Sequence, residues 1–110
     1  LLEYWDGACA VTGIAVPELL RASHAKPWAD CESDEERLNA YNGFLLCAHL
    51  DALFDRGLMT FDQEGVVVFS NELSGEVREQ LHLEDQLKLR WATDAHQAFL
   101  DYHRDKVFRG

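Results

Sequence analysis

The stretch Tyr41–Leu58, YNGFLLCAHLDALFDRGL, predicts the centre of the fold. Tyr41-Asn42-Gly43 has the residue types of a tight turn, and the apolar run Phe44–Cys47 after it predicts a buried strand. His49–Leu58 then has leucines and a phenylalanine at helical spacing, which predicts a short helix with one apolar face. A turn, a strand and a short helix are therefore expected to follow one another directly.

The residues before this stretch predict its partner strand. Pro17–His24, PELLRASH, reads as a strand, and Lys26-Pro27-Trp28 turns the chain away, because proline disfavours a helical residue before it. Ala29–Arg37 is acidic and predicts a surface loop or a short helix. The first half of the chain is thus expected to form a strand–strand–helix unit.

The second half predicts one hairpin and two helices. Met59–Ser70 reads as a hairpin that turns at Gln63-Glu64-Gly65. Gly75–Leu83 predicts a short helix, and Thr93–Phe108 a longer amphipathic one. The fold class expected from this order is α+β. The residues expected to face inward on the last helix are Ala95, Ala98, Phe99, Tyr102 and Val107.

The chain has 110 residues, of which 47% are hydrophobic, and this suits one domain over residues 1–110. It begins with Leu1 rather than methionine, so we expect it to be a piece of a longer protein. Other domains of that parent protein are then expected to take part in selecting the target.

Cysteine usage and hydropathy predict a cytoplasmic protein. Cys9, Cys31 and Cys47 are widely spaced and odd in number, which argues against a disulfide framework. The longest apolar runs, Gly43–Cys47 and Gly65–Phe69, are far shorter than the roughly 20 residues of a membrane span. The sequence therefore predicts no contact with a membrane.

Charge argues against a protein that holds nucleic acid by its whole surface. The 20 acidic residues outnumber the 10 basic ones, which gives a net charge of −10. Nucleic-acid binding depends mainly on lysine and arginine beside phosphates. A local basic strip or a bound cation at one cleft stays compatible with this composition.

Three segments in order carry a resemblance to a known family. They are CAVTG at Cys9–Gly13, RASHAKPW at Arg21–Trp28, and ERLNAYNGFLLCAHLDALFDRGL at Glu36–Leu58. The set resembles the bacterial HNH endonucleases, above all the branch found in restriction and anti-phage defence proteins, and the similarity extends to Tyr102-His103-Arg104. The resemblance implies a ββα-metal (HNH) core, here with an added β-hairpin and C-terminal helices.

The resemblance also implies roles for individual residues. His24 corresponds to the general base that activates water, and Asn42 to the central asparagine that orders the loop. Asp51 stands nine residues after Asn42, where the family's metal-binding histidine is usual. Asp55, one helical turn further on, matches a second position that some members use for metal.

The chain departs from the family pattern at two of these positions. Ser23 stands directly before the base, where many members have a metal ligand, and Asp51 replaces the usual histidine. His49, two residues earlier, is an alternative ligand, and Ser23 a possible neighbour of the site. Carboxylates are hard oxygen ligands, so the expected ion is Mg²⁺ or Mn²⁺ rather than Zn²⁺ or Ni²⁺.

Two basic residues flank the motif and are candidate phosphate contacts. Arg37 offers a bidentate fork and Lys26 a point charge, although an ordinary surface role suits both equally well. Asp51 has an alternative too, as the helix N-cap or as an acid in the first helical turn that the helix dipole stabilises.

The function predicted from the sequence is metal-dependent hydrolysis of DNA phosphodiester bonds, without sequence preference in this domain. One alternative is a non-catalytic DNA-binding or interaction module that keeps the fold, which Ser23, Asp51 and the acidic charge favour. A nuclease that cuts RNA is a third reading.

Overall fold

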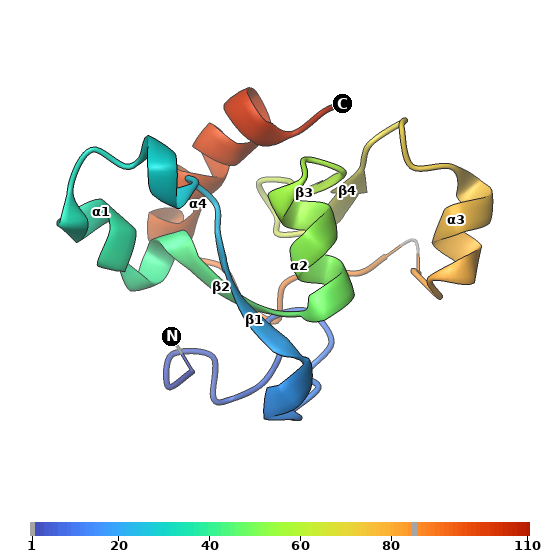
Figure 1. Ribbon diagram of the computed structural model, residues 1–110, viewed down its shortest axis with the longest axis horizontal. Helices are drawn as coiled ribbons and strands as arrows, with labels where there is room; N and C mark the ends of the chain where they lie inside the picture. Colours follow the sequence, from blue (N-terminus) through green and yellow to red (C-terminus); the bar gives the residue numbers. More distant parts are fainter. Residues whose placement is uncertain (1, 85) are drawn as a thin grey trace.

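An antiparallel pair of strands lies at the centre of the computed structural model, which describes residues 2–84 and 86–110. The strands are β1 (Leu20–His24) and β2 (Gly43–Cys47), and α2 (Ala48–Asp55) follows β2 without a loop. Figure 1 shows α2 beside the crossed strands. Every residue of β2 is buried, as its continuous apolar run predicts.

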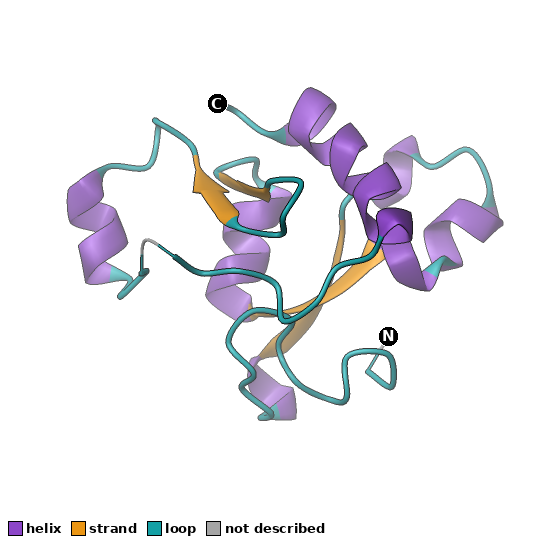
Figure 2. Ribbon diagram, turned by 180° about the vertical axis from the view of Figure 1, so that it is seen from behind, coloured by secondary structure: helices purple, strands orange, loops and turns teal. Residues whose placement is uncertain are grey.

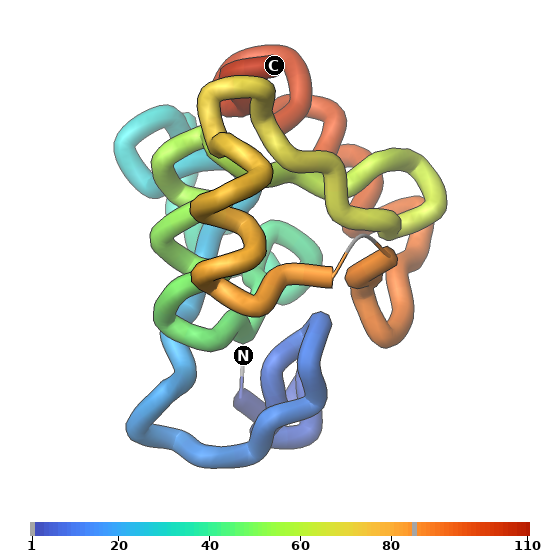
Figure 3. The backbone as a smooth tube through the Cα atoms, turned by 90° about the vertical axis from the view of Figure 1, so that its right-hand side faces the viewer, coloured from blue at the N-terminus to red at the C-terminus, as the bar shows by residue number. Residues whose placement is uncertain are grey.

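A second strand pair lies at the far end of α2. The strands β3 (Met59–Phe61) and β4 (Val67–Phe69) form a hairpin, and the turn between them uses Gly65 at a φ of +80°. Leu89 and Arg90, which come later in the chain, link this hairpin to the N-terminal segment. Leu89 N donates to Gly65 O at 2.9 Å, and Arg90 N donates to Ala10 O at 2.7 Å. Figure 2 shows the long loop that contains these two residues in front of the central strands, and Figure 3 shows it between the N-terminal loops and the hairpin.

Short helices surround these two strand pairs. Each of the helices α1 (Asp34–Leu38), α3 (Gly75–Gln80) and α4 (Asp94–Tyr102) is capped by a side chain that accepts a hydrogen bond from a backbone N–H three residues ahead; the caps are Ser33, Ser74 and Thr93. The remaining elements are the 3₁₀ turns η1 (Pro17–Leu19), η2 (Trp28–Asp30) and η3 (Ala40–Asn42), and the π-helical turn η4 (His103–Val107).

Aromatic rings form much of the core between the central strands, α2 and the hairpin. Phe44 of β2 packs against Phe54 of α2 at 5.8 Å and against Phe61 of β3 at 6.0 Å between ring centroids. These three side chains are fully buried, so they join both strand pairs into one hydrophobic core. Across residues 2–84 and 86–110, no helix has the length and apolar character needed to cross a bilayer.

The predicted α+β class and the strand–strand–helix order are confirmed. Several bounds and buried faces differ from the sequence-based expectation. The predicted strand over Pro17–His24 begins only at Leu20, because Pro17 opens a 3₁₀ turn. On α4, Ala95 and Ala98 are exposed, and the inward positions are His96 and Leu100.

Candidate functional site

The register of the central strands places His24 at their end. His24 pairs with Gly43, and Ser23 pairs with Phe44. Successive side chains of a strand point to opposite faces. Ser23 accordingly contacts α2, whereas Ala22 and His24 line a pocket of about 260 Å³ on the other side.

The His24 ring is fixed by one hydrogen bond and one aromatic contact. Its Nε2 lies 3.1 Å from the carbonyl oxygen of Arg37, and its ring meets Trp28 at 88° with centroids 5.6 Å apart. Because a carbonyl can only accept, Nε2 must carry the proton. In the neutral ring Nδ1 then keeps its lone pair, and Nδ1 has no hydrogen-bond partner in the part of the chain that is described.

Asn42 holds the loop that follows His24. Its side chain is fully buried, and its Oδ1 accepts from Lys26 N at 2.8 Å. Its Nδ2 lies within hydrogen-bond distance of Lys26 O at 3.2 Å and Glu36 O at 3.3 Å. One amide therefore fixes both ends of the loop from Lys26 to Glu36. Arg37 follows this loop directly and supplies the carbonyl that holds His24.

The two candidate phosphate contacts have partners within the fold. Lys26 Nζ lies 2.9 Å from a Glu36 carboxylate oxygen, and this bond raises the pKa of Lys26. Two hydrogen bonds lower the pKa of Glu36. The larger effect comes from Glu32 N and the smaller one from Lys26. Arg37 donates to Trp28 O, Cys31 O and Asp34, so each guanidinium nitrogen makes one hydrogen bond within the fold. Both cations are thus positioned by contacts within the fold, and each keeps N–H groups beyond those used in these contacts.

The structure brings Asp51 to Ser23. The Ser23 hydroxyl donates to Asp51 Oδ1, and Asp51 is half-buried on the side of α2 that packs on β1. Asp51 is not the helix cap, since Cys47 holds that position without a side-chain bond. Asp55 is exposed one turn further along α2.

The predicted ligands and His24 are not gathered into one cluster. Within residues 2–84 and 86–110, no three histidine, cysteine, aspartate or glutamate side chains are grouped as a metal site would require. His49 is exposed and lines a separate pocket of about 340 Å³ with Thr12 and His82. The adjacent oxygens of Ser23 and Asp51 still suit Mg²⁺ or Mn²⁺, which need only one or two protein carboxylates besides water and substrate phosphate.

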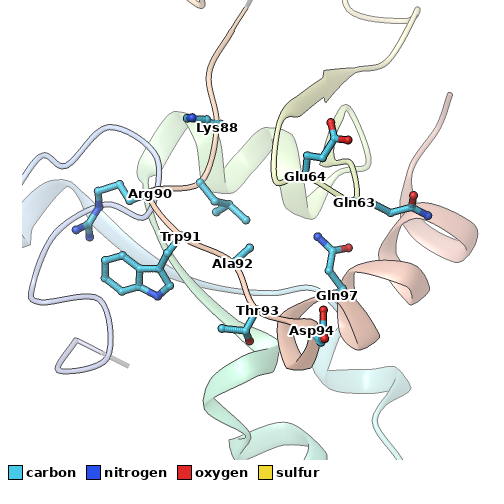
Figure 4. Close-up of a pocket in the computed structure, with 10 residues that line it drawn as sticks. Gln63, Glu64, Lys88, Arg90, Trp91, Ala92, Thr93, Asp94 and Gln97 are labelled. Carbon is cyan, nitrogen blue, oxygen red and sulfur yellow. The ribbon is translucent and has the colours of Figure 1, made fainter.

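Another pocket, of about 310 Å³, lies between the hairpin turn and the start of α4. Figure 4 shows Gln97 directed toward the turn at Gln63 and Glu64. Gln97 Nε2 donates to Asp62 O at 3.1 Å, so its role there is to hold the hairpin against α4. None of the residues predicted for catalysis or metal binding lines this pocket.

Sequence reasoning missed two features of the His24 pocket. Trp28 stands in the segment Arg21–Trp28, but the sequence does not predict that its ring is exposed beside His24. The Arg37 carbonyl could not be found from sequence, because every residue type has a backbone carbonyl.

Comparison with known proteins identifies the family. A family model described as HNH endonuclease matches residues 9–62, which include His24, Asn42 and Asp51. The fold is similar to a solved structure named "Modification dependent TagI restriction endonuclease", with a TM-score of 0.61 and 19% identity. The alignment covers 96% of this chain and 35% of that one, so the chain spans about a third of that protein's length. No curated protein matches the sequence. Residues 9–62 of the chain belong to the HNH endonuclease family.

Proposed function

We propose that this domain is a divalent-metal-dependent endonuclease that hydrolyses DNA phosphodiester bonds with His24 as general base. The observation that carries the proposal is the His24 ring, whose Nε2 is bonded to Arg37 O within a pocket at the end of the strand pair. That bond favours the tautomer with a free Nδ1 lone pair, which is the atom a general base needs. Membership of a nuclease family supports the same reaction class.

In the proposed reaction, Nδ1 of His24 takes a proton from water. The water oxygen forms a bond to phosphorus, and the bond from phosphorus to the leaving sugar oxygen breaks. The Arg37 carbonyl keeps the ring oriented while Nδ1 holds the proton. Asn42 acts indirectly, because it holds the loop that presents this carbonyl.

Asp51 and Ser23 are the proposed metal-holding residues, with Asp55 as the second carboxylate. When bound, the ion would supply electrostatic stabilisation of the leaving oxygen. Ser23 Oγ and Asp51 Oδ1 are already adjacent, which supports a shared oxygen site on the α2 side of β1. Mg²⁺ and Mn²⁺ are the ions that this donor set favours.

A restriction or anti-phage role within a larger cytoplasmic protein is part of the proposal. The matched solved structure is named as a modification-dependent restriction endonuclease, and this chain covers 35% of it. We infer that other domains of the parent protein select the DNA, while this acidic domain cuts it.

A cleavage assay with supercoiled plasmid tests the proposed activity. The purified chain is expected to nick the plasmid with Mg²⁺ or Mn²⁺, to stop with EDTA, and to respond much more weakly to Zn²⁺. Cleavage that survives exhaustive chelation would refute the metal dependence, and no cleavage with any of these ions would refute the activity.

Asp51 has a separate test that measures metal rather than cleavage. Asp51→Asn is expected to lower Mn²⁺ affinity strongly, and Asp55→Asn by an equal or smaller amount, because each removes a carboxylate charge. Isothermal titration with Mn²⁺ measures this, with exposed Asp105→Asn as the matched control. Equal affinities in all four proteins would overturn the assignment and make His49 the next ligand to test.

A non-catalytic DNA-binding module is the second candidate function. The Ser23–Asp51 bond favours it, since the two side chains satisfy each other without an ion. This reading predicts DNA binding with no cleavage under any metal, which the plasmid assay distinguishes.

A further inference from the structure

An exposed tryptophan stands beside the proposed general base. Trp28 keeps 55% of its surface exposed, whereas Trp5 is fully buried in the core. Leu38, at 75% exposed, lines the same pocket as Trp28 and His24. An apolar surface of this kind costs solubility and contributes little to folding, so it calls for an explanation beyond packing.

Trp28 is held in place although it is exposed. The Arg37 guanidinium lies over the indole, 5.8 Å from the ring centroid, and Arg37 Nε also donates to Trp28 O at 3.2 Å. His24 meets the ring at right angles. A ring braced in this way loses little conformational entropy when a ligand binds to it.

The pocket chemistry favours a flat, uncharged group over a phosphate. Apart from the amide of Asn39, its other walls come from small or aliphatic residues, and each Arg37 nitrogen already donates one hydrogen bond within the fold. An exposed aromatic ring, by contrast, stacks on any base without help from a charge. The walls are formed by Ala22, Leu38, Asn39, Ala40 and Gly43.

We propose that Trp28, with Leu38 beside it, stacks on a nucleobase next to the scissile phosphate and so positions the strand against His24. This inference rests on the proposed nuclease function, since it names the substrate subsite beside the same histidine. Stacking needs no positive charge, which suits a domain with a net charge of −10.

Binding without cleavage provides the first test. In EDTA, the indole N–H signals of the chain are followed by NMR as a deoxyadenosine tetranucleotide is added, and Trp28→Phe identifies the Trp28 signal. The Trp5 and Trp91 indoles donate to Gly43 O and to the Tyr4 hydroxyl, so their signals serve as internal controls. We expect the Trp28 signal to move with the tetranucleotide and to stay with an abasic analogue of equal length and charge. Equal movement with both probes, or none with either, would overturn the stacking.

Cleavage provides the second test. Trp28→Leu is expected to lower kcat/KM on plain duplex by about 5- to 150-fold, the usual range for loss of one stacked base. The same comparison is then made on duplexes that carry a single abasic site, placed in turn at each position beside the cut. At the position whose base stacks on Trp28, the base is missing, so the kcat/KM of the variant and of the wild type should be equal. Trp28→Phe should retain much of the activity, and Val68→Ala, an exposed apolar residue of β4, should retain all of it.

The two tests separate this inference from the proposed function. If the wild type cuts nothing, the NMR result still decides whether Trp28 binds a base. If the wild type cuts but Trp28→Leu loses the same factor on every abasic duplex, the stacking is wrong and the nuclease proposal stands. The pH dependence of kcat separates stacking from an effect on His24, because only a disturbed His24 would shift it.

Discussion

His103 is a buried histidine whose two ring nitrogens are both bonded. Its ring stacks on Phe54 at 3.8 Å, Nε2 donates to Phe54 O at 2.8 Å, and Nδ1 accepts from the Thr60 hydroxyl at 2.8 Å. Burial lowers the pKa of His103 to about 4 from its usual value of 6.5. The fold therefore favours the neutral ring, which packs in the core.

Stability is expected to fall with acid because of His103. The unfolded chain binds a proton at this histidine as the pH drops below about 6.5, and the folded chain does so only near 4. The free energy of unfolding should thus decline across this window by about 3 kcal/mol through His103 alone. Burial lowers the pKa of His96 too, so His96 adds a change of the same sign.

Urea denaturation between pH 7 and pH 4 measures this dependence. His103→Gln removes one titrating group, and its stability should decline less steeply than that of the wild type. Parallel curves for the two proteins would show that His103 does not control the acid response.

Single residues of the site were predictable only where a side-chain type carries the information. His24 and Asn42 stand out in the sequence because an imidazole and a turn amide have few substitutes in such a motif. Their partners do not stand out, since Arg37 O, Lys26 O and Glu36 O are backbone atoms. The Ser23–Asp51 bond spans 28 residues and depends on how α2 packs on β1.

At the scale of elements, Gly57 lies in the turn between α2 and β3, where the chain packs closely against the C-terminal residues Val107 and Arg109. Its φ is +76°, its carbonyl accepts from Arg109 N at 2.8 Å, and an added Cβ would overlap the carbonyl of Val107. Glycine is therefore required here both for its backbone angle and for the lack of a side chain.

Gly57→Ala is expected to cost at least about 2 kcal/mol of stability, from the left-handed backbone and the overlap with Val107. Gly75→Ala in the first turn of α3 is the matched control, because a Cβ there meets no atom within 4 Å. The control should be neutral or stabilising by up to about 1 kcal/mol. Thermal unfolding measures both, and equal losses would contradict the account of Gly57.

Element types were more predictable than the faces that the elements bury. The apolar periodicity placed Ala95 and Ala98 inward on α4, but His96 takes the inward position instead. His96 Nδ1 accepts from Thr93 N, and its ring packs against Tyr4 and Tyr41. A pattern that counts histidine as polar cannot predict this, because cap and aromatic contacts decide the burial.

At the scale of the whole molecule, charge limits how this domain can meet DNA. The net charge is −10, and several cations are bonded within the fold. Arg90 donates to three backbone carbonyls of the N-terminal segment, and Arg104 to Phe61 O and Gln97. These side chains hold distant segments together rather than presenting charge to a phosphate backbone.

The isolated domain is expected to bind duplex DNA weakly and with little dependence on salt. Few phosphates can be neutralised, so the slope of log K against log salt should be shallower than about −3. Fluorescence anisotropy with a labelled duplex between 50 and 200 mM salt measures the slope. A tight complex with a steep slope would show that this domain carries the affinity that we assign to other parts of the parent protein.

The central claim is that His24 activates water for phosphodiester hydrolysis, and single-turnover plasmid cleavage in Mn²⁺ tests it most directly. His24→Ala is compared with the wild type and with His82→Asn, a control at an exposed turn, after circular dichroism shows all three to be folded. The account predicts that His24→Ala cuts about 10²- to 10⁴-fold more slowly while the control keeps its rate. Cleavage by folded His24→Ala within a few-fold of the wild type would contradict it.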